Sequence, residues 1–265
     1  MISSLLNGII SNKLNVNHLT SSIANFAVNF NKKLDYFYIK TVYQGNPSLP
    51  TVIFINGFLQ KDESVKDWYK AVSQKFPYNT KIWVNWDSKK IEELCPLMFN
   101  IGEAMPRFLI DFWYTAALNA EKAGIRLAKE LTERNNKSGY ILMGHSLGCR
   151  VAFNAVKNLN NNVKIDSMYL LAGAIGNRNW EDIIKRVKNK IYNFYSPEDY
   201  VLLYAYQLAS AGLAETPIGI APISAYSSKI KNKNVTKILD RCSNSSSFIH
   251  MRYKDSFKEM LQTIH

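Results

Sequence analysis

One serine of the chain lies where it could act as a nucleophile. Ser146 stands in GHSLG (144–148), with the apolar run YILM before it and the helix-like run CRVAFNAV after it. A serine in a tight strand-to-helix turn needs Gly144 and Gly148, because larger side chains there would collide with the neighbouring strand and helix. The N–H of Leu147, at the positive end of the helix, would face a developing oxyanion. The pattern predicts a nucleophile; the alternative is an ordinary small residue in a glycine-bearing turn.

A nucleophilic serine needs a histidine that accepts its proton. In this strand–turn–helix setting the expected order along the chain is serine, acid, histidine. Four histidines are present, and only His250 and His265 follow Ser146. His250, in SSSFIHMRY, can be carried by a loop to the carboxyl edge of the sheet, whereas His265 is the last residue. His18 lies near the amino terminus, and His145 is expected to turn away from the neighbouring hydroxyl.

The acid is expected directly after a strand, at the same edge of the sheet. Asp199, in NKIYNFYSPEDYVL, meets this condition, whereas Asp166 precedes its strand and belongs at the opposite edge. Glu198 and Asp240 are reserve candidates. Each main candidate has an ordinary alternative: Asp199 as a charge at a helix amino terminus, and His250 as a surface-loop histidine.

A second oxyanion donor is expected from the loop after an early strand, TVIFINGFLQ. Gly57 permits a close turn there, and the N–H of Phe58 is the predicted donor. The side chains of Phe58 and Leu59 either line an acyl pocket or belong to the core.

The elements that must position these residues alternate between short apolar strands and longer helical patterns. This alternation is typical of parallel strands joined by crossover helices, and it predicts an α/β protein with helices on both faces of the sheet. A turn, GNPSLP, is expected to join the first two strands as a hairpin. The strands are expected at 34–43, 51–56, 81–86, 139–143, 165–171, 189–195 and 235–239, and the helices at 64–75, 103–133, 147–159, 179–187, 198–212 and 252–262.

Two further segments bear on domain organisation. Residues 1–33 carry apolar side chains at helical spacing, which predicts an amphipathic helix packed on the main domain, 34–265, or lying on a membrane surface. The mostly uncharged segment 200–223 suits a helical lid or pocket wall, and an ordinary buried helix with its connection is the alternative.

Composition and charge narrow the function classes. The chain is 47% hydrophobic and 20% charged, which is typical of one globular domain, and its net charge is +12 with a pI of about 9.4. This positive charge either attracts the protein to an anionic membrane or is merely a result of a composition rich in Asn and Lys. Nucleic-acid binding is not expected, because the basic residues form no single stripe.

The sequence predicts no metal site and no cofactor. Cys95, Cys149 and Cys242 are too few and too irregularly spaced for a disulfide framework or a zinc site. No secretory signal and no run of about 18 apolar residues is evident. A cytoplasmic or peripheral-membrane location is therefore expected, and secretion by a signal-independent route stays open.

Several motifs together resemble one family, the α/β-hydrolase-like domain of the transmembrane and coiled-coil domain-containing proteins. The resemblance covers about residues 50–255 and is carried, in order, by INGFLQKDESVKDW, VNWDS, GHSLGCRVAFNAVKNL, YLLAGAIGNRNW, NFYSPEDYVL and FIHMRY. It implies an α/β-hydrolase fold and a lipase-like or esterase-like activity, with Ser146 as nucleophile, Asp199 as acid and His250 as base. The chain lacks the spanning helices of the larger family members.

These observations favour a serine hydrolase that cleaves esters of lipids or other apolar acyl compounds through an acyl-enzyme. A phospholipase acting at anionic membranes, conceivably as a toxin, is a narrower alternative. A non-catalytic interaction module that keeps the fold is the alternative from another class.

Overall fold

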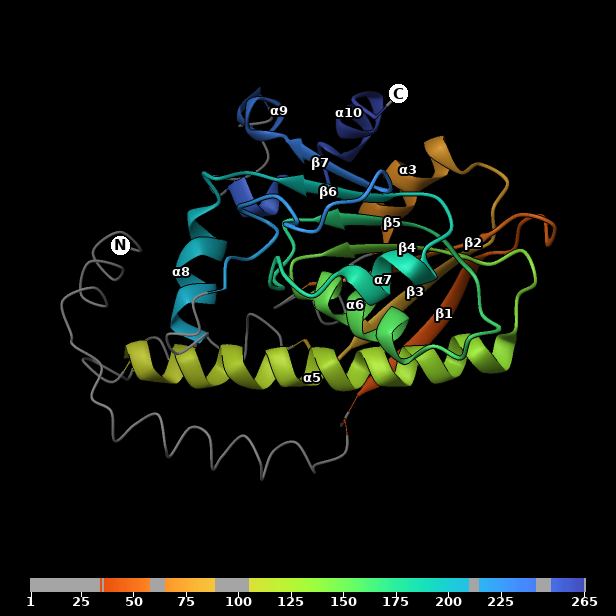
Figure 1. The fold of residues 1–265 in the computed structure, drawn as a ribbon, viewed down its shortest axis with the longest axis horizontal. Helices are drawn as coiled ribbons and strands as arrows, with labels where there is room; N and C mark the ends of the chain where they lie inside the picture. Colours follow the sequence, from red (N-terminus) through yellow and green to blue (C-terminus); the bar gives the residue numbers. More distant parts are fainter. Residues whose placement is uncertain are drawn as a thin grey trace.

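The computed structural model describes residues 34, 36–57, 65–88, 105–209, 215–241 and 249–264. These residues form one mixed α/β unit (Figure 1). Its strands are β1 (Phe37–Tyr43), β2 (Thr51–Ile55), β3 (Lys81–Trp86), β4 (Tyr140–His145), β5 (Ile165–Leu171), β6 (Ile191–Tyr195) and β7 (Ile230–Asn234). Its helices are α3 (Lys66–Lys75), α5 (Met105–Arg134), α6 (Leu147–Asn158), α7 (Glu181–Arg186), α8 (Tyr200–Ala209), α9 (Thr236–Arg241), the 3-10 helix η1 (Ile249–Met251) and α10 (Phe257–Gln262). The predicted segment 1–33 and its boundary with the main domain lie outside the described residues.

The strands form one seven-stranded sheet in the order β1-β3-β2-β4-β5-β6-β7. The edge strand β1 is antiparallel to β3, and all other neighbours are parallel. A mostly parallel sheet in this order, with helices on both faces, is the α/β-hydrolase fold. The predicted fold class is therefore confirmed.

The predicted hairpin between the first two strands is wrong. β1 pairs with β3, from Phe37 opposite Trp86 to Tyr43 opposite Lys81. β2 has no free edge for β1, because it already pairs with β3 on one side and β4 on the other. The connection does contain a turn, closed by the N–H of Leu49 on the carbonyl of Asn46, but it packs on the segment before β3, where the N–H of Asn46 donates to the carbonyl of Tyr78.

The predicted strand at 235–239 is also wrong, because residues 236–239 belong to α9 and Val235 directly precedes it. The side chain of Asn234 accepts a hydrogen bond from the N–H of Thr236 at 3.0 Å, which caps the start of the helix. Val235, Ile238 and Leu239 are buried at helical spacing. The last strand is the preceding polar segment IKNKN, whose lysines suit the edge of a sheet.

The helix predicted at 252–262 is shorter than expected. Only α10 is α-helical there, because η1 and a series of turns come before it. Of the segment 200–223, residues 200–209 form α8, and residues 215–223 form a connection that packs against the end of β5. Ile218 is fully buried, and the N–H of Gly219 donates to the carbonyl of Gly173 after β5.

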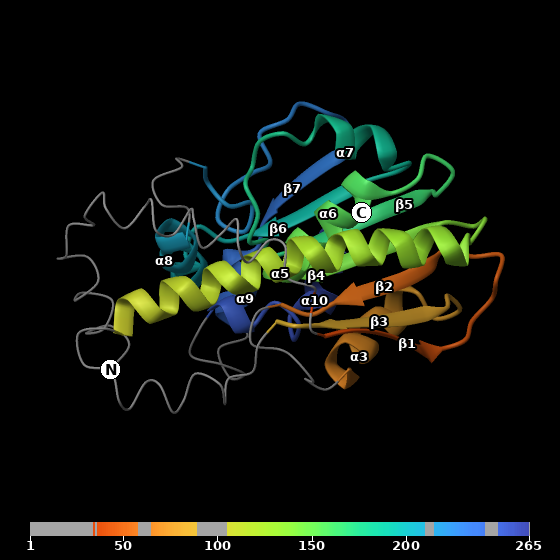
Figure 2. The same ribbon diagram turned by 90° about the horizontal axis from the view of Figure 1, so that it is seen from below.

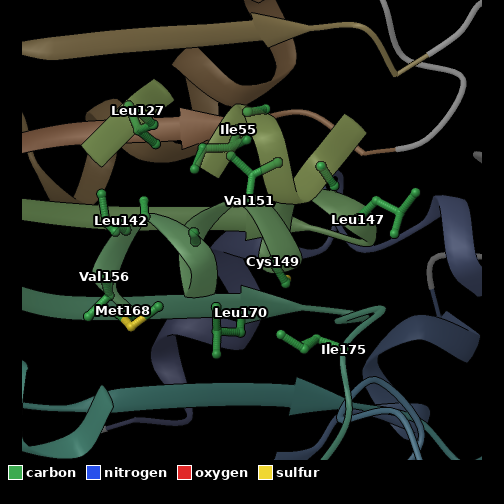
Figure 3. Close-up of a cluster of buried hydrophobic side chains, with 14 of the residues drawn as sticks. Ile55, Leu127, Leu142, Leu147, Cys149, Val151, Val156, Met168, Leu170 and Ile175 are labelled. Atoms are coloured by element: carbon green, nitrogen blue, oxygen red, sulfur yellow. The ribbon is translucent and has the colours of Figure 1, made fainter. Parts of the chain in front are cut away.

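Side chains of the central strands alternate between two hydrophobic layers. Ile53 and Ile55 of β2 face the layer of α5, α6 and α7, whereas Val52 and Phe54 face the layer of α3, α9 and α10. The long helix α5 crosses one face of the sheet (Figure 2). Figure 3 shows the layer under α6, where Val151 and Val156 lie over the sheet. Because both faces of the sheet are buried, the register of each strand is fixed. The positions of the strand ends, where the following loops begin, are fixed with it.

Within the described ranges, no helix combines the length and the hydropathy that crossing a membrane requires.

Candidate active site

The turn between β4 and α6 holds Ser146 in a strained backbone conformation. Its φ is 54° and its ψ is −122°, a region that non-glycine residues rarely adopt. Three hydrogen bonds fix the turn: its N–H donates to the Leu171 carbonyl at 2.9 Å, and its own carbonyl accepts from Cys149 and Ala174. The surrounding backbone therefore holds the strain and presents the side chain at the carboxyl edge of the sheet.

Glycine is required on both sides of this turn. A Cβ on Gly144 would lie 2.7 Å from the backbone nitrogen of Cys149. A Cβ on Gly148 would lie 2.4 Å from the carbonyl oxygen of Ile55 and 2.7 Å from that of Asn56. The obstacles are backbone atoms, so rotation of a side chain cannot relieve either contact.

The first testable consequence concerns Gly148→Ala. Because its Cβ would push α6 away from the end of β2, we expect the free energy of unfolding to fall by about 1–3 kcal/mol. Any activity of the site should fall with it, because the turn and the end of β2 move apart. Chemical denaturation measures the first effect. Lys157→Ala, on the exposed face of the same helix, is the control, and equal stability of the two variants would contradict the packing described here.

Three side chains from distant parts of the chain meet at this edge. His250 Nε2 lies 3.0 Å from Ser146 Oγ, and His250 Nδ1 lies 2.7 Å from Asp199 Oδ2. All three side chains are buried. A carboxylate at Nδ1 favours the tautomer with its proton on Nδ1, which leaves Nε2 free to accept a proton from the serine hydroxyl.

Asp199 has a second role at the start of α8. Its Oδ1 accepts a hydrogen bond of 3.0 Å from the N–H of Leu202, while Oδ2 faces the imidazole. The helix thereby fixes the rotamer of the carboxylate and aims it at His250.

The other acid candidates lie elsewhere. Asp166 is in β5 near its amino end and accepts hydrogen bonds from Ser167 and Asn189. Glu198 and Asp240 are exposed to solvent. Of the other histidine candidates, His18 and His265 lie outside the described residues.

His145 contributes a contact that the sequence did not indicate. Its Nε2 lies 2.9 Å from the backbone carbonyl oxygen of His250, so the ring nitrogen is directed at this carbonyl. Burial, and then electrostatic interactions with His250 and Lys254, hold the pKa of His145 well below its usual value. The neutral ring can therefore donate from Nε2 and brace the backbone that carries His250.

Burial of neutral His145 has a consequence for stability. Unfolded His145, with a pKa of about 6.5, gains a proton as the pH falls, whereas the folded protein does not, so stability is lost below that pH. Between pH 6.5 and 5, the free energy of unfolding of the wild type should therefore fall as the pH falls. We expect this fall to be smaller in His145→Gln, by up to about 1.4 kcal/mol per pH unit. Urea titrations across this range measure it. Parallel curves for both proteins would contradict a neutral, buried His145.

The end of β2, where the second oxyanion donor was predicted, is held by two tryptophans. Trp68 Nε1 donates to Asn56 Oδ1 and Trp86 Nε1 donates to the Asn56 carbonyl, each at 2.9 Å. These contacts join residues far apart in sequence, which is why the local pattern did not reveal them. They hold Asn56 against Gly148, at the start of α6.

Of the two predicted oxyanion donors, Leu147 is among the described residues and Phe58 is not. Leu147 is buried and is the first residue of α6, where backbone N–H groups have no partner within the helix. Phe58, the other predicted donor, and Leu59 lie outside the described residues; the description of this loop ends at Gly57.

Among the described residues, no group of three or more His, Cys, Asp or Glu side chains could hold a metal ion. Cys149 is buried below the turn, and its thiol donates to the carbonyl of Gly144. Burial raises the pKa of this thiol, which keeps it protonated.

Comparison with known families adds a classification. A family model described as "Protein of unknown function (DUF726)" matches residues 104–265, more than half of the chain. The chain belongs to the DUF726 family. The matched part of this DUF726 chain contains Ser146, Asp199 and His250. No curated protein matches the chain.

Solved structures similar to the DUF726 chain include several hydrolases. One is described as a predicted CIB-like hydrolase from Thermoplasma acidophilum, with 12% identity, a TM-score of 0.39, and coverage of 86% of this chain and 89% of that chain. A lipase from Bacillus licheniformis has 12% identity, a TM-score of 0.37, and coverage of 77% and 90%. An esterase from Thermogutta terrifontis has 10% identity, a TM-score of 0.36, and coverage of 86% and 88%.

Proposed function

We propose that the protein is a serine hydrolase that cleaves carboxylic esters of lipids or other apolar acyl compounds. One observation carries the proposal: the hydrogen-bonded chain from Ser146 through His250 to Asp199, built on a strained turn. A strained serine, a base within hydrogen-bond reach and a buried carboxylate that orients the base together make an activated nucleophile.

In the proposed reaction, Ser146 Oγ attacks the ester carbonyl and gives its proton to His250 Nε2. Asp199 keeps the imidazole in its tautomer and stabilises the imidazolium that forms. The backbone N–H groups of Leu147 and Phe58 donate to the tetrahedral oxyanion. His250 then protonates the leaving alcohol, and a water molecule, activated by the same histidine, hydrolyses the acyl-enzyme.

Exposed apolar side chains beside the site support an apolar substrate. Tyr200, Val201 and Met251 are 57%, 39% and 44% exposed. Tyr200 and Val201 directly follow Asp199 in sequence, and Met251 directly follows His250, so all three flank a hydrogen-bonded pair. Aromatic and aliphatic groups at the rim of a site favour contact with acyl chains or a lipid surface.

This rim can be tested by substitution. We expect Val201→Ser/Met251→Ser to raise KM for emulsified long-chain esters by about three- to tenfold, because less apolar surface is buried on binding. Hydrolysis of a soluble acetate ester should change little. Lys237→Ser/Lys258→Ser, which alters exposed charged positions instead, is the control. Equal changes on both substrates would contradict a rim that contacts lipid.

The same assays test the substrate class and its alternatives. Activity should rise from acetate to longer acyl esters, and contact with anionic membranes is tested with vesicles that contain phosphatidylglycerol. A preference for these vesicles over neutral emulsions would favour a phospholipase. Hydrolysis of none of these substrates by folded protein would favour a non-catalytic module. We also propose that the chain is related to the transmembrane and coiled-coil domain-containing proteins.

A further inference from the structure

A basic groove lies at the amino edge of the sheet, opposite the candidate active site. Its volume is about 1060 Å³. It is formed by the residues that precede β5, β6 and β7 and by the carboxyl ends of α6 and α7. The basic residues that line it are Lys157, Lys164, Lys185, Arg186, Lys188 and Lys229.

The charge of this basic groove is poorly balanced. Among the described residues, six cationic side chains line it against one carboxylate, Asp182, which pairs with Lys185 at 2.9 Å. Lys157, Lys164 and Lys188 are exposed and form no ion pair with any residue that the structure describes. One carboxylate cannot offset six like charges brought together, so an anion that binds here gains free energy by relieving the remaining repulsion.

Two of the cations are held in place by backbone groups. Arg186 donates to the carbonyl of Leu159 at 2.8 Å, and Lys229 Nζ donates to the carbonyl of Val187 at 2.6 Å. The carbonyls keep these side chains from reorienting but do not cancel their full positive charge. The groove therefore combines two cations that backbone carbonyls hold in place with exposed lysines, and the held cations lose less conformational entropy on binding.

The lining of the groove is also partly apolar. Val163 is partly exposed between the charged groups, whereas Ile165 and Val187 are fully buried beneath it. The N–H of Lys188 donates to the carbonyl of Ile165 at 2.8 Å, which ties the segments before β5 and β6 together. A ligand that fits this lining has negative charges beside the lysines and apolar groups that contact Val163 and the aliphatic stems of the lysines.

The position of the groove separates it from the proposed chemistry. Lys188 precedes β6 and Asp199 follows it, so the five-residue strand places the groove about 17 Å or more from the catalytic edge. A bilayer held at the groove would face the edge opposite Ser146, which argues against a role in presenting membrane substrate. A nucleic acid is also less suitable, because the described residues that line the groove include no aromatic side chain for bases to stack on.

We propose that this basic groove binds an extended acidic polypeptide segment of a partner protein, with Asp or Glu alternating with apolar residues. The acidic side chains pair with Lys157, Lys164 and Lys188, and the apolar ones contact Val163 and the neighbouring lining. Binding at the amino edge leaves the catalytic edge open, so the partner can be bound while substrate is hydrolysed.

A direct test uses a fluorescent 12-residue peptide of alternating Glu and Leu and the full chain. Fluorescence anisotropy should give saturable one-to-one binding that weakens as salt rises. Lys157→Glu/Lys164→Glu/Lys188→Glu should weaken it about tenfold or more, since each lost contact contributes up to about 1 kcal/mol and each new carboxylate repels the peptide.

The matched control is Lys40→Glu/Lys70→Glu/Lys237→Glu, which changes three exposed lysines outside the groove and gives the same net charge. It should keep most of the affinity, and circular dichroism checks that both variants are folded. Equal weakening by the two variants, or no binding by the wild type at low salt, would overturn the proposal. Stronger competition by single-stranded RNA or by phosphatidylglycerol vesicles than by the unlabelled peptide would also overturn it, in favour of those ligands.

Discussion

Ser146→Ala is expected to lower ester hydrolysis by on the order of 10⁴-fold or more, because it removes the attacking oxygen while the rest of the site stays intact. The residual rate should come from substrate positioning and the oxyanion donors alone. Initial rates with a soluble short-chain ester, measured on protein purified in parallel with the wild type, give the comparison.

The control for Ser146→Ala is Ser228→Ala, which changes an exposed serine far from the turn. We expect full activity from this control, and melting temperatures should show that both variants fold. Hydrolysis by Ser146→Ala at the wild-type rate would contradict the assignment of the nucleophile.

Asp199→Asn is expected to lower kcat by about 10⁴-fold at neutral pH. An amide keeps an oxygen that can cap the N–H of Leu202, so α8 should remain in place. It lacks the negative charge, however, and an NH₂ group facing His250 Nδ1 selects the tautomer with its proton on Nε2. That nitrogen can no longer accept the proton of Ser146, so the base is lost without loss of the fold.

Asp166→Asn, near the amino end of β5, is the control for this charge removal. It should keep kcat within a few-fold of the wild type, because it contacts Asn189 and Ser167 and not the imidazole. If Asp199→Asn kept activity within about tenfold of the wild type, the carboxylate would not be the group that orients His250.

Much of the fold was predictable from the sequence, because the decisive signals are local. The segments TVIFI and IDSMYLL are strands as expected, since residues buried on both faces of a parallel sheet are mostly apolar, as in VIFI and MYLL. The turn at Ser146 was predictable because its signals are also local. Its two glycines, the strand before it and the helix after it all lie within about twenty residues of sequence.

Features that depend on distant partners were not predictable. The pairing of β1 with β3 depends on β4 taking the other edge of β2, which no local pattern reports. Asn234 as a helix cap outweighed the strand propensity of Val235 and Thr236. The contact of His145 with the His250 carbonyl joins residues 105 positions apart, and the tryptophans on Asn56 likewise meet only in the folded chain.

Covalent labelling of the folded protein by a fluorophosphonate probe tests the central claim most directly. The probe reacts with a serine that a neighbouring base activates, and it needs no knowledge of the natural substrate. We predict one adduct per chain, located on Ser146 by peptide mass spectrometry, with none on Ser146→Ala and much slower labelling of Asp199→Asn. A folded wild-type protein that stays unlabelled, or that is labelled at another serine, would contradict the proposed catalytic site.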